Sequence, residues 1–337
     1  MSSCLVLIGF AEFGLRVVAP IHLAGIQSAY RYDEDLGYRL GPGLHLYRLT
    51  DHLEEVRTNR LGTVNFQESF DGYPEVAFAL GDSFTQGTGL PADASYPFQL
   101  DLLWNRDELG FYAKKLAIVN LGLAAFGGQQ SLVSLERFAK ELGTPDYVLY
   151  LGSDNDWDDD VLFESGYRHR HIVYGSPRWG ASVRPLLWLG ELELVKRGKL
   201  AIAELRRLRL VAEAESRQGA GQPGTPISVA EREWPVIEEI HQRTQEWGST
   251  LILSWANAPG PSYSWLRERA AQAGIAFADW EPRAASVQAA IPELPFANPH
   301  SGGHWRPWAN AEIAQAYAAA LRRAGAVGGA AEAALPH

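Results

Sequence analysis

The chain runs directly from an apolar stretch into a serine. Residues 75–80 read EVAFAL, and Gly81, Asp82 and Ser83 follow with no spacer. A serine at the end of a central strand, flanked by small residues and followed by a helix, is where several hydrolases place a nucleophile. Its hydroxyl needs a base to take its proton and donors to stabilise an oxyanion. Without those groups, a serine that caps the next helix explains the pattern equally well.

Three later segments supply groups of these kinds. Residues 118–132 predict a strand that ends in a loop of small residues, whose backbone N–H groups are available to an oxyanion. Residues 145–160 predict a strand that ends in an Asn-Asp pair, and residues 298–317 place a histidine in a Gly-rich loop before the last helix. Because the carboxyl ends of parallel strands meet at one edge of a sheet, these groups are expected to share one site.

The order of these segments resembles the SGNH (GDSL-type) hydrolase family over most of the chain, from RYDEDLGYRLGPG to the last helix. LGDSFTQGTGL is similar to the first block of the family, which makes Ser83 the expected nucleophile. NDW resembles the third block and implies that the Asn155 side chain donates to the oxyanion. GHW resembles the last block and implies His304 as the general base. By spacing from Asn120, Ala125 takes the place of the glycine whose N–H joins the oxyanion hole.

The resemblance implies a carboxylic-ester hydrolase, or an acyltransferase with the same acyl-enzyme chemistry, and no metal or organic cofactor. The HW ending is similar to the subgroup that acts on or O-acetylates polysaccharides of the cell envelope. The expected partner is therefore a small-molecule or carbohydrate ester. The acyl group, the acceptor and the choice between hydrolysis and transfer stay open, as does the oligomeric state.

The sequence departs from the family pattern at the acid that orients the histidine. Ser301 and Gly302 occupy the usual positions of that acid. Loss of this carboxylate costs the best-studied serine hydrolases about 10⁴-fold in rate. Three alternatives follow: a Ser83–His304 dyad oriented by a backbone carbonyl, a distant acid such as Asp279, or a degenerate site in a protein that binds envelope glycan.

Smaller ambiguities remain around the site. The third block is one residue longer than usual, which leaves Asp154 as a rival of Asn155. His300 and His304 with the carboxylate run 154–160 suggest a metal phosphoesterase, but the two glycines between the histidines argue against a helical metal pair. Residues 158–160 are interpreted as a solvated turn. Trp305 is interpreted either as core packing or as a face that stacks on sugar rings.

Apolar runs at 75–80, 116–123, 147–152, 250–256 and 275–280 alternate with helical patterns at 96–105, 128–142, 235–247, 262–273 and 308–325. This alternation predicts an α/β fold with a doubly wound, mostly parallel sheet. The interval 157–233 interrupts it and predicts a helical cap insertion. The expected organisation is an N-terminal apolar helix (1–25), an α/β domain (26–156 and 234–325), the cap and a tail (326–337).

Composition and the N-terminus constrain partners and location. The 337 residues carry a net charge of −10, which argues against general nucleic-acid binding because phosphate neutralisation needs an excess of Lys and Arg. The single cysteine provides no disulfide framework. Residues 4–19 are interpreted as a packed helix, a remnant of a signal or anchor helix, or a surface amphipathic helix. An extracytoplasmic or envelope location with membrane association through residues 4–25 is expected, and a cytoplasmic location stays open.

Overall fold

The structure is a computed structural model of the whole chain. It describes residues 2–18, 29–49, 53–106, 115–164, 228–298 and 303–326, with single positions between 192 and 209. The chain divides into two compact units, Met1–Arg39 with Val161–Gly224 and Leu40–Asp160 with Thr225–His337. The second unit contains the central sheet and every described residue of the candidate site.

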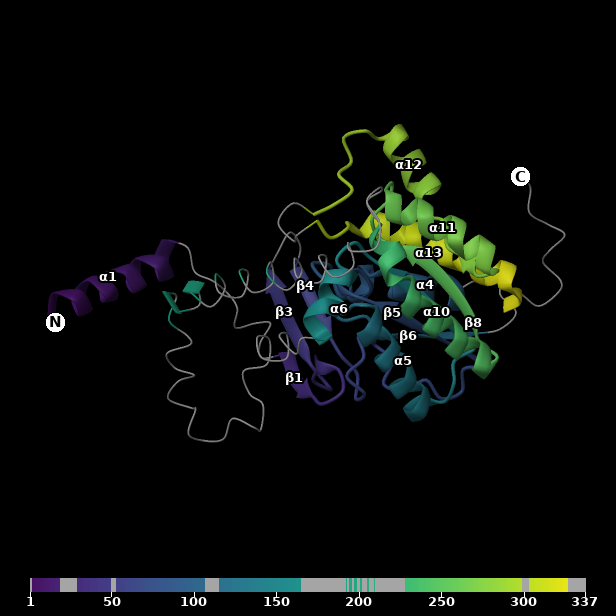
Figure 1. Cartoon of the computed structure of the whole chain (residues 1–337), viewed down its shortest axis with the longest axis horizontal. Coiled ribbons are helices and arrows are strands. Elements are labelled where there is room, and N and C mark those ends of the chain that lie inside the picture. The colour runs from purple at the N-terminus through teal and green to yellow at the C-terminus, as the bar shows by residue number, and fades with distance from the viewer. Residues whose placement is uncertain are drawn as a thin grey trace. The chain divides into compact units, whose positions relative to one another are not determined.

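A five-stranded sheet forms the centre of the second unit, with the strand order β6-β5-β7-β8-β9 (Figure 1). All four pairings between neighbours are parallel. The prediction of a doubly wound α/β fold is confirmed, because β6 lies on one side of β5 while β7, β8 and β9 follow on the other. The strands are β5 (Glu75–Gly81), β6 (Leu116–Asn120), β7 (Tyr147–Gly152), β8 (Thr250–Trp255) and β9 (Ala276–Phe277).

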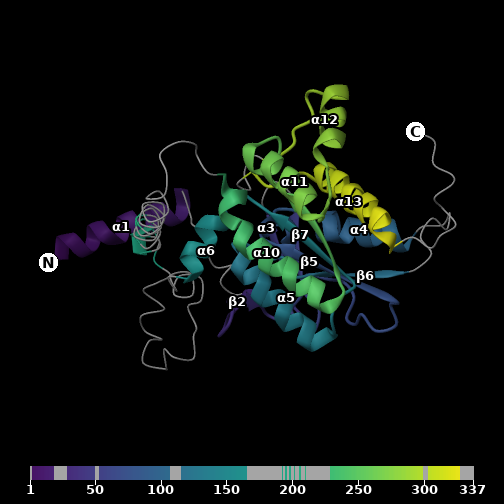
Figure 2. The same cartoon turned by 45° about the vertical axis from the view of Figure 1, so that its right-hand side comes forward.

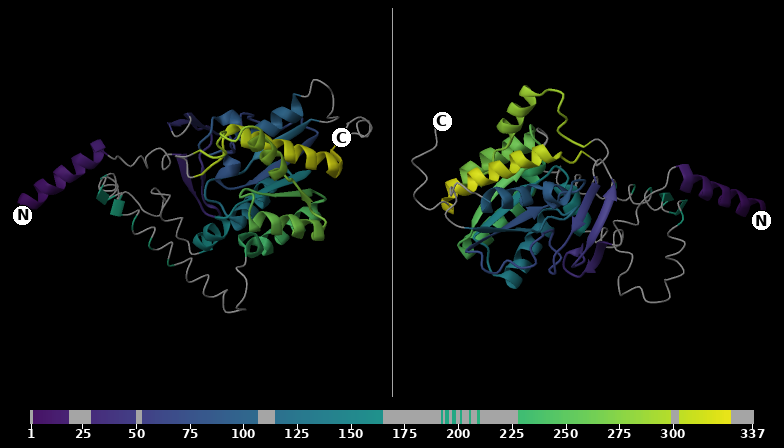
Figure 3. Two further views of the ribbon diagram at one scale, coloured as in Figure 1. Left: turned by 90° about the horizontal axis from the view of Figure 1, so that it is seen from above. Right: turned by 180° about the vertical axis from the view of Figure 1, so that it is seen from behind.

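Helices cover both faces of this sheet, which explains why its strands are continuous apolar runs. On one face α4 (Tyr96–Asn105) packs against α13 (Pro307–Leu321). On the other face α5 (Gly128–Leu142) packs against α10 (Val229–Trp247), and α11 (Pro261–Ala273) lies beside α10 (Figure 2). Figure 3 shows α13, in yellow, along the sheet from two further sides.

Several boundaries differ from those predicted. α10 begins six residues before Pro235, because Ser228 caps it by accepting a hydrogen bond from the Glu231 backbone N–H. β9 has only two residues. α13 ends at Leu321 and continues as one wider turn, Arg322–Ala326, within which Gly325 has the non-helical φ of +97°. The elements that the pattern did not predict are α3 (Ser83–Gln86), a short 3₁₀ turn (Ala92–Ala94), α6 (Asp156–Glu164) and α12 (Glu281–Ala290).

The segment 30–57 contains short strands in two small sheets. β1 (Tyr30–Asp33) pairs with β2 (Gly37–Leu40), and β3 (His45–Leu49) pairs antiparallel with β4 (Leu53–Arg57). Neither pair joins the central sheet. This part of the chain therefore contains two separate two-stranded sheets.

The N-terminal helix α1 (Ser2–Val18) exposes large apolar side chains, among them Phe10, Phe13 and Val18. An ion pair between Glu12 and Arg16 lies on the same helix. Within the described part of the chain, no helix has the length and apolar character needed to cross a bilayer. Association with a membrane through residues 4–25 stays a prediction, and residues 19–28 lie outside the described ones.

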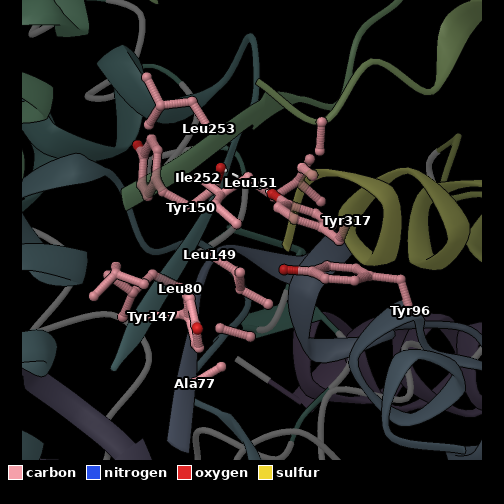
Figure 4. Packing of buried hydrophobic residues seen from close by; sticks show 14 of the residues in the cluster. Ala77, Leu80, Tyr96, Tyr147, Leu149, Tyr150, Leu151, Ile252, Leu253 and Tyr317 are labelled. Carbon is pink, nitrogen blue, oxygen red and sulfur yellow. Dashed lines mark hydrogen bonds between the residues drawn. The ribbon is translucent and has the colours of Figure 1, made fainter. Parts of the chain in front are cut away.

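The core of the second unit includes three fully buried tyrosines (Figure 4). The rings of Tyr96 and Tyr317 stack with their centroids 5.1 Å apart, which joins α4 to α13. The Tyr317 hydroxyl donates to the backbone carbonyl of Tyr150 at 2.9 Å. The last helix is thereby fixed to β7, and the loop that leads into this helix carries His304.

Candidate active site

The structure brings Ser83 and His304 together across 221 residues of sequence. Ser83 directly follows the end of β5 and is the first residue of α3, and Asp82 caps that helix by accepting from the Phe84 N–H. The Nε2 atom of His304 lies 2.7 Å from the Ser83 Oγ. This distance lies within the range for a hydrogen bond between a nucleophile and its base. The contact can therefore carry the serine proton to the imidazole.

Backbone bonds and aromatic rings hold His304 in place. The His304 carbonyl accepts from the Asn298 N–H at 2.7 Å, and Trp305 forms a bridge with Ala297. The Phe84 ring lies 5.0 Å from the imidazole, centroid to centroid, and 4.5 Å from Trp305. Trp305 is only 4% exposed, so the interpretation that it stacks on sugar rings is wrong and it packs in the core instead.

The loop after β6 lies against the turn that carries Ser83. The Asn120 side chain donates to the Thr85 carbonyl at 3.0 Å, and the Ala124 N–H donates to Gln86 Oε1 at 2.6 Å. Ala125 follows with φ +66°, the left-handed conformation that favours glycine. The position that the family resemblance assigns to a glycine thus keeps a glycine-like backbone here.

The third loop brings Asn155, and not its rival Asp154, to the residue before the nucleophile. The Asn155 Nδ2 donates to Asp82 Oδ2 at 3.2 Å and to Asp159 Oδ2 at 2.8 Å. Asp154 is bound elsewhere, since its Oδ1 accepts from Trp255 Nε1 at 2.8 Å. In this conformation both amide protons of Asn155 point to carboxylates, so its role as an oxyanion donor stays a prediction.

The structure corrects the interpretation of residues 158–160 as a solvated turn. They belong to α6, and Asp159 and Asp160 are 2% and 4% exposed. Both oxygens of Asp160 accept from the Gln129 N–H at 3.1 Å, near the start of α5. Asp82 and Asp156 are buried as well. Sequence reasoning missed these acids as parts of the site because a run of aspartates is usually solvated, although Asp82 adjoins Ser83.

Burial changes the protonation of this cluster. Burial, followed by the charges of Asp160 and Asp156, raises the pKa of Glu233 well above its ordinary value. Burial and the charge of Asp82 raise the pKa of Asp156 in the same way. Burial also raises the pKa of Asp82, but hydrogen bonds from Phe84, Ser153 and Asn155, together with the charge of His304, lower it in part.

Replacing Glu233 by glutamine is expected to stabilise the protein increasingly as pH rises. Below the ordinary glutamate pKa of about 4, the folded and unfolded states both hold the proton. Above it the unfolded chain releases the proton while the folded protein keeps it. The free energy of unfolding then falls by up to about 1.4 kcal/mol per pH unit, until the pH reaches the raised pKa. The glutamine variant lacks this loss.

The measurement is urea unfolding of both proteins from about pH 5 to about pH 8. Glu238→Gln is the matched control, since Glu238 lies on the same helix with a 54% exposed side chain that faces Arg269. A stability difference between Glu233→Gln and the parent that stays constant with pH would contradict the prediction.

The distant-acid hypothesis for His304 is wrong for Asp279. Its Oδ1 accepts from the Tyr263 hydroxyl at 2.6 Å, and its Oδ2 pairs with Arg267 at 3.4 Å. The positions of His300, Ser301 and Gly302 lie outside the described residues. In the described ranges, no group of three or more His, Cys, Asp or Glu side chains has the arrangement of a metal site.

Solved structures of lipolytic proteins resemble the chain at low identity. A putative lipolytic protein of the G-D-S-L family from Desulfitobacterium hafniense shares 13% identity over 73% of this chain and 99% of its own, with a TM-score of 0.40. A G-D-S-L family member from Veillonella parvula shares 10% over 74% and 98%, with a TM-score of 0.42. The psychrotrophic esterase EstA from Pseudoalteromonas shares 11% over 74% and 97%, with a TM-score of 0.41.

No protein-family model matches the chain, and no curated protein matches it. The residues and the geometry of the site indicate its chemistry.

Proposed function

We propose that the chain is a serine esterase of the SGNH type, with Ser83 as the nucleophile and His304 as the general base. The contact of 2.7 Å between the Ser83 Oγ and the His304 Nε2 carries this proposal. The contact joins Ser83 of the first sequence block to His304 of the last one, the two residues that the family resemblance implies as nucleophile and base. They meet at the carboxyl edge of a parallel sheet, where ligands bind.

The mechanism uses two transfers of the acyl group. The Ser83 Oγ attacks the ester carbonyl while its proton passes to the His304 Nε2. The N–H groups of Ser83 and Ala125 and the Asn155 amide donate to the oxyanion, which requires Asn155 to turn one N–H from a carboxylate toward it. The leaving alcohol takes the proton from His304, and water then attacks the acyl-serine by the reverse sequence.

Asp82 supplies a negative charge near the imidazolium that forms in this mechanism. Burial raises the pKa of Asp82, and the charge of His304 is among the influences that lower it in part, so the ionised Asp82 and the imidazolium attract one another. This attraction supports a Ser83–His304 dyad in a chain that has Ser301 and Gly302 at the usual place of the acid.

The proposed substrate is an acylated carbohydrate or another small ester. The support is the Gly303-His304-Trp305 segment, which resembles that of the envelope-polysaccharide subgroup. A sugar hydroxyl that attacks in place of water would convert hydrolysis into acyl transfer. A location at the cell envelope is part of the same proposal.

A fluorophosphonate probe is expected to label Ser83, because such probes react with serines that a base activates. Mass spectrometry of the digested protein locates the modified peptide, and the label is expected to disappear in His304→Ala. Retention of the label in His241→Ala, a histidine on α10, shows that the loss is specific. If the folded protein stays unlabelled and binds glycan, the esterase proposal is wrong. The chain is then a degenerate SGNH-type protein that binds glycan.

A further inference from the structure

One hydroxyl lies between two buried acids behind the nucleophile. The Ser153 Oγ lies 2.9 Å from Asp82 Oδ2, 2.8 Å from Asp156 Oδ1 and 2.8 Å from Asn155 Oδ1. A hydroxyl has a single proton to donate, and the amide oxygen of Asn155 has none. The hydroxyl therefore cannot satisfy both carboxylates fully if both are ionised.

The site also excludes the water that would otherwise screen two charges. Asp82 and Ser153 are completely buried, and Asp156 is 2% exposed. Like charges that share a buried site do not both ionise, and such carboxyl pairs hold a proton between them. One additional proton on either acid allows the Ser153 Oγ to be hydrogen-bonded to both acids, as donor to one and acceptor from the other.

The hydrogen bonds indicate which acid holds the proton. Apart from the shared Ser153 hydroxyl, each acid accepts from two donors. Those of Asp82 reach both of its oxygens, the Phe84 N–H at Oδ1 and the Asn155 amide at Oδ2. Those of Asp156, the Tyr150 hydroxyl and the Ser153 N–H, both bind Oδ2 at 3.0 Å. The Asp156 Oδ1 contacts the Ser153 Oγ at 2.8 Å, so a proton on this oxygen can be donated to the Oγ while both bonds to Oδ2 are kept.

We propose that Asp156 is a neutral carboxylic acid in the resting protein, and that it acts with Ser153 as a positioning pair that keeps Asp82 ionised. The protonated Oδ1 of Asp156 donates to the Ser153 Oγ, and the Ser153 hydroxyl donates to Asp82 Oδ2. Asp82 then carries the single negative charge of this chain of bonds and orients the Asn155 amide.

The titratable groups around Asp156 favour its neutral form. The titratable groups that face it or its direct partners are Asp82 at the end of β5, Tyr150 on β7, Asp159 and Asp160 on α6, Glu233 on α10 and, beyond Asp82, His304. All of these except His304 are acidic. Asp82 is the acid that lies nearer the histidine charge, which favours ionisation of Asp82 over Asp156.

The protonation state of Asp156 does not depend on the proposed esterase function. The positioning of Asn155 as an oxyanion donor does rest on that proposed function. The first experiment is therefore made on the resting protein. Aspartate labelled with ¹³C at the side-chain carboxyl is incorporated into the full chain, and NMR follows each carboxyl signal with pH. Because only aspartate is labelled, the buried Glu233 gives no signal in this experiment.

One aspartate signal is expected to stay in the protonated position at neutral pH, to be missing from Asp156→Asn and to remain in Glu233→Gln. The proposal is overturned if every aspartate is ionised at neutral pH in the folded parent protein. It is equally overturned if the protonated signal survives in Asp156→Asn and is lost in Asp82→Asn. The titration of the parent decides the first point even if a variant does not fold.

Ester hydrolysis tests the positioning role. Asparagine at 156 can donate and accept as the neutral acid does, so Asp156→Asn is expected to keep kcat within about threefold. Asp82→Asn removes the charge that orients Asn155 and is expected to lower kcat by up to the ~10²-fold that loss of an oxyanion donor costs. Equal losses in both variants would contradict the assignment, whereas absence of activity in the parent would count against the proposed function only.

Discussion

Replacement of His304 by alanine is expected to lower kcat/KM for an activated ester by about 10⁴-fold or more. The reason is that the His304 Nε2 is the base on the Ser83 Oγ, at 2.7 Å, and an alcohol without a base is a poor nucleophile. Initial rates with a chromogenic ester at several pH values measure the effect.

Two controls separate the loss of a base from a loss of structure. His241→Ala removes a histidine of α10 that has no role in the proposed mechanism, and it is expected to keep the parent rate. Added imidazole can occupy the space beside Phe84 and is expected to restore part of the activity of His304→Ala. Activity of His304→Ala within tenfold of the parent would exclude His304 as the base.

The sequence was sufficient to predict the parallel sheet and the ranges of two of the helices that cover it. The ranges of α4 and α5 agree residue for residue with the predicted segments 96–105 and 128–142. Their boundaries are signalled locally, by Ser95 with Pro97 at the start of α4 and by Gly143 at the end of α5. The start of α10 was missed because Pro235 suggested a first turn, whereas the actual cap is Ser228.

Ser83 and His304 could be predicted because residue type and position within the sequence pattern identify them. The buried acids could not, because burial depends on contacts distant in sequence. Asp160 lies against the start of α5, where the Gln129 backbone N–H donates to it, and Asp82 lies beside Ser153, which follows the neighbouring strand. A run of aspartates by itself carries no sign of such partners.

Gly81→Ala is expected to lower the free energy of unfolding by about 2–5 kcal/mol, from backbone strain and a steric clash together. Gly81 has φ +141°, a conformation that residues with a Cβ rarely adopt. A Cβ at this position would lie 2.4 Å from the Leu151 carbonyl oxygen and 2.5 Å from Thr85 Oγ1. The carbonyl belongs to the backbone of β7 and cannot rotate away, so β5 and β7 would have to separate.

A matched glycine isolates the clash from the strain. Gly72 has φ +83° with nothing within 4 Å of its Cβ position, so Gly72→Ala is expected to cost only the strain, about 1–2 kcal/mol. Urea unfolding of both variants measures the difference, and equal costs would show that the close approach to Leu151 is unimportant.

The same substitution connects the backbone at Gly81 to the chemistry at Ser83. Any separation of β5 from β7 moves the end of β5. Ser83 lies two residues beyond Gly81 and moves with it, whereas its base, His304, comes from a different segment. A misplacement of about 1 Å can cost about 10²-fold in rate. Folded Gly81→Ala is therefore expected to lose most of its fluorophosphonate labelling, whereas folded Gly72→Ala keeps it. Glycine precedes the Asp-Ser pair because only a residue without a side chain lets the strand end this close to β7.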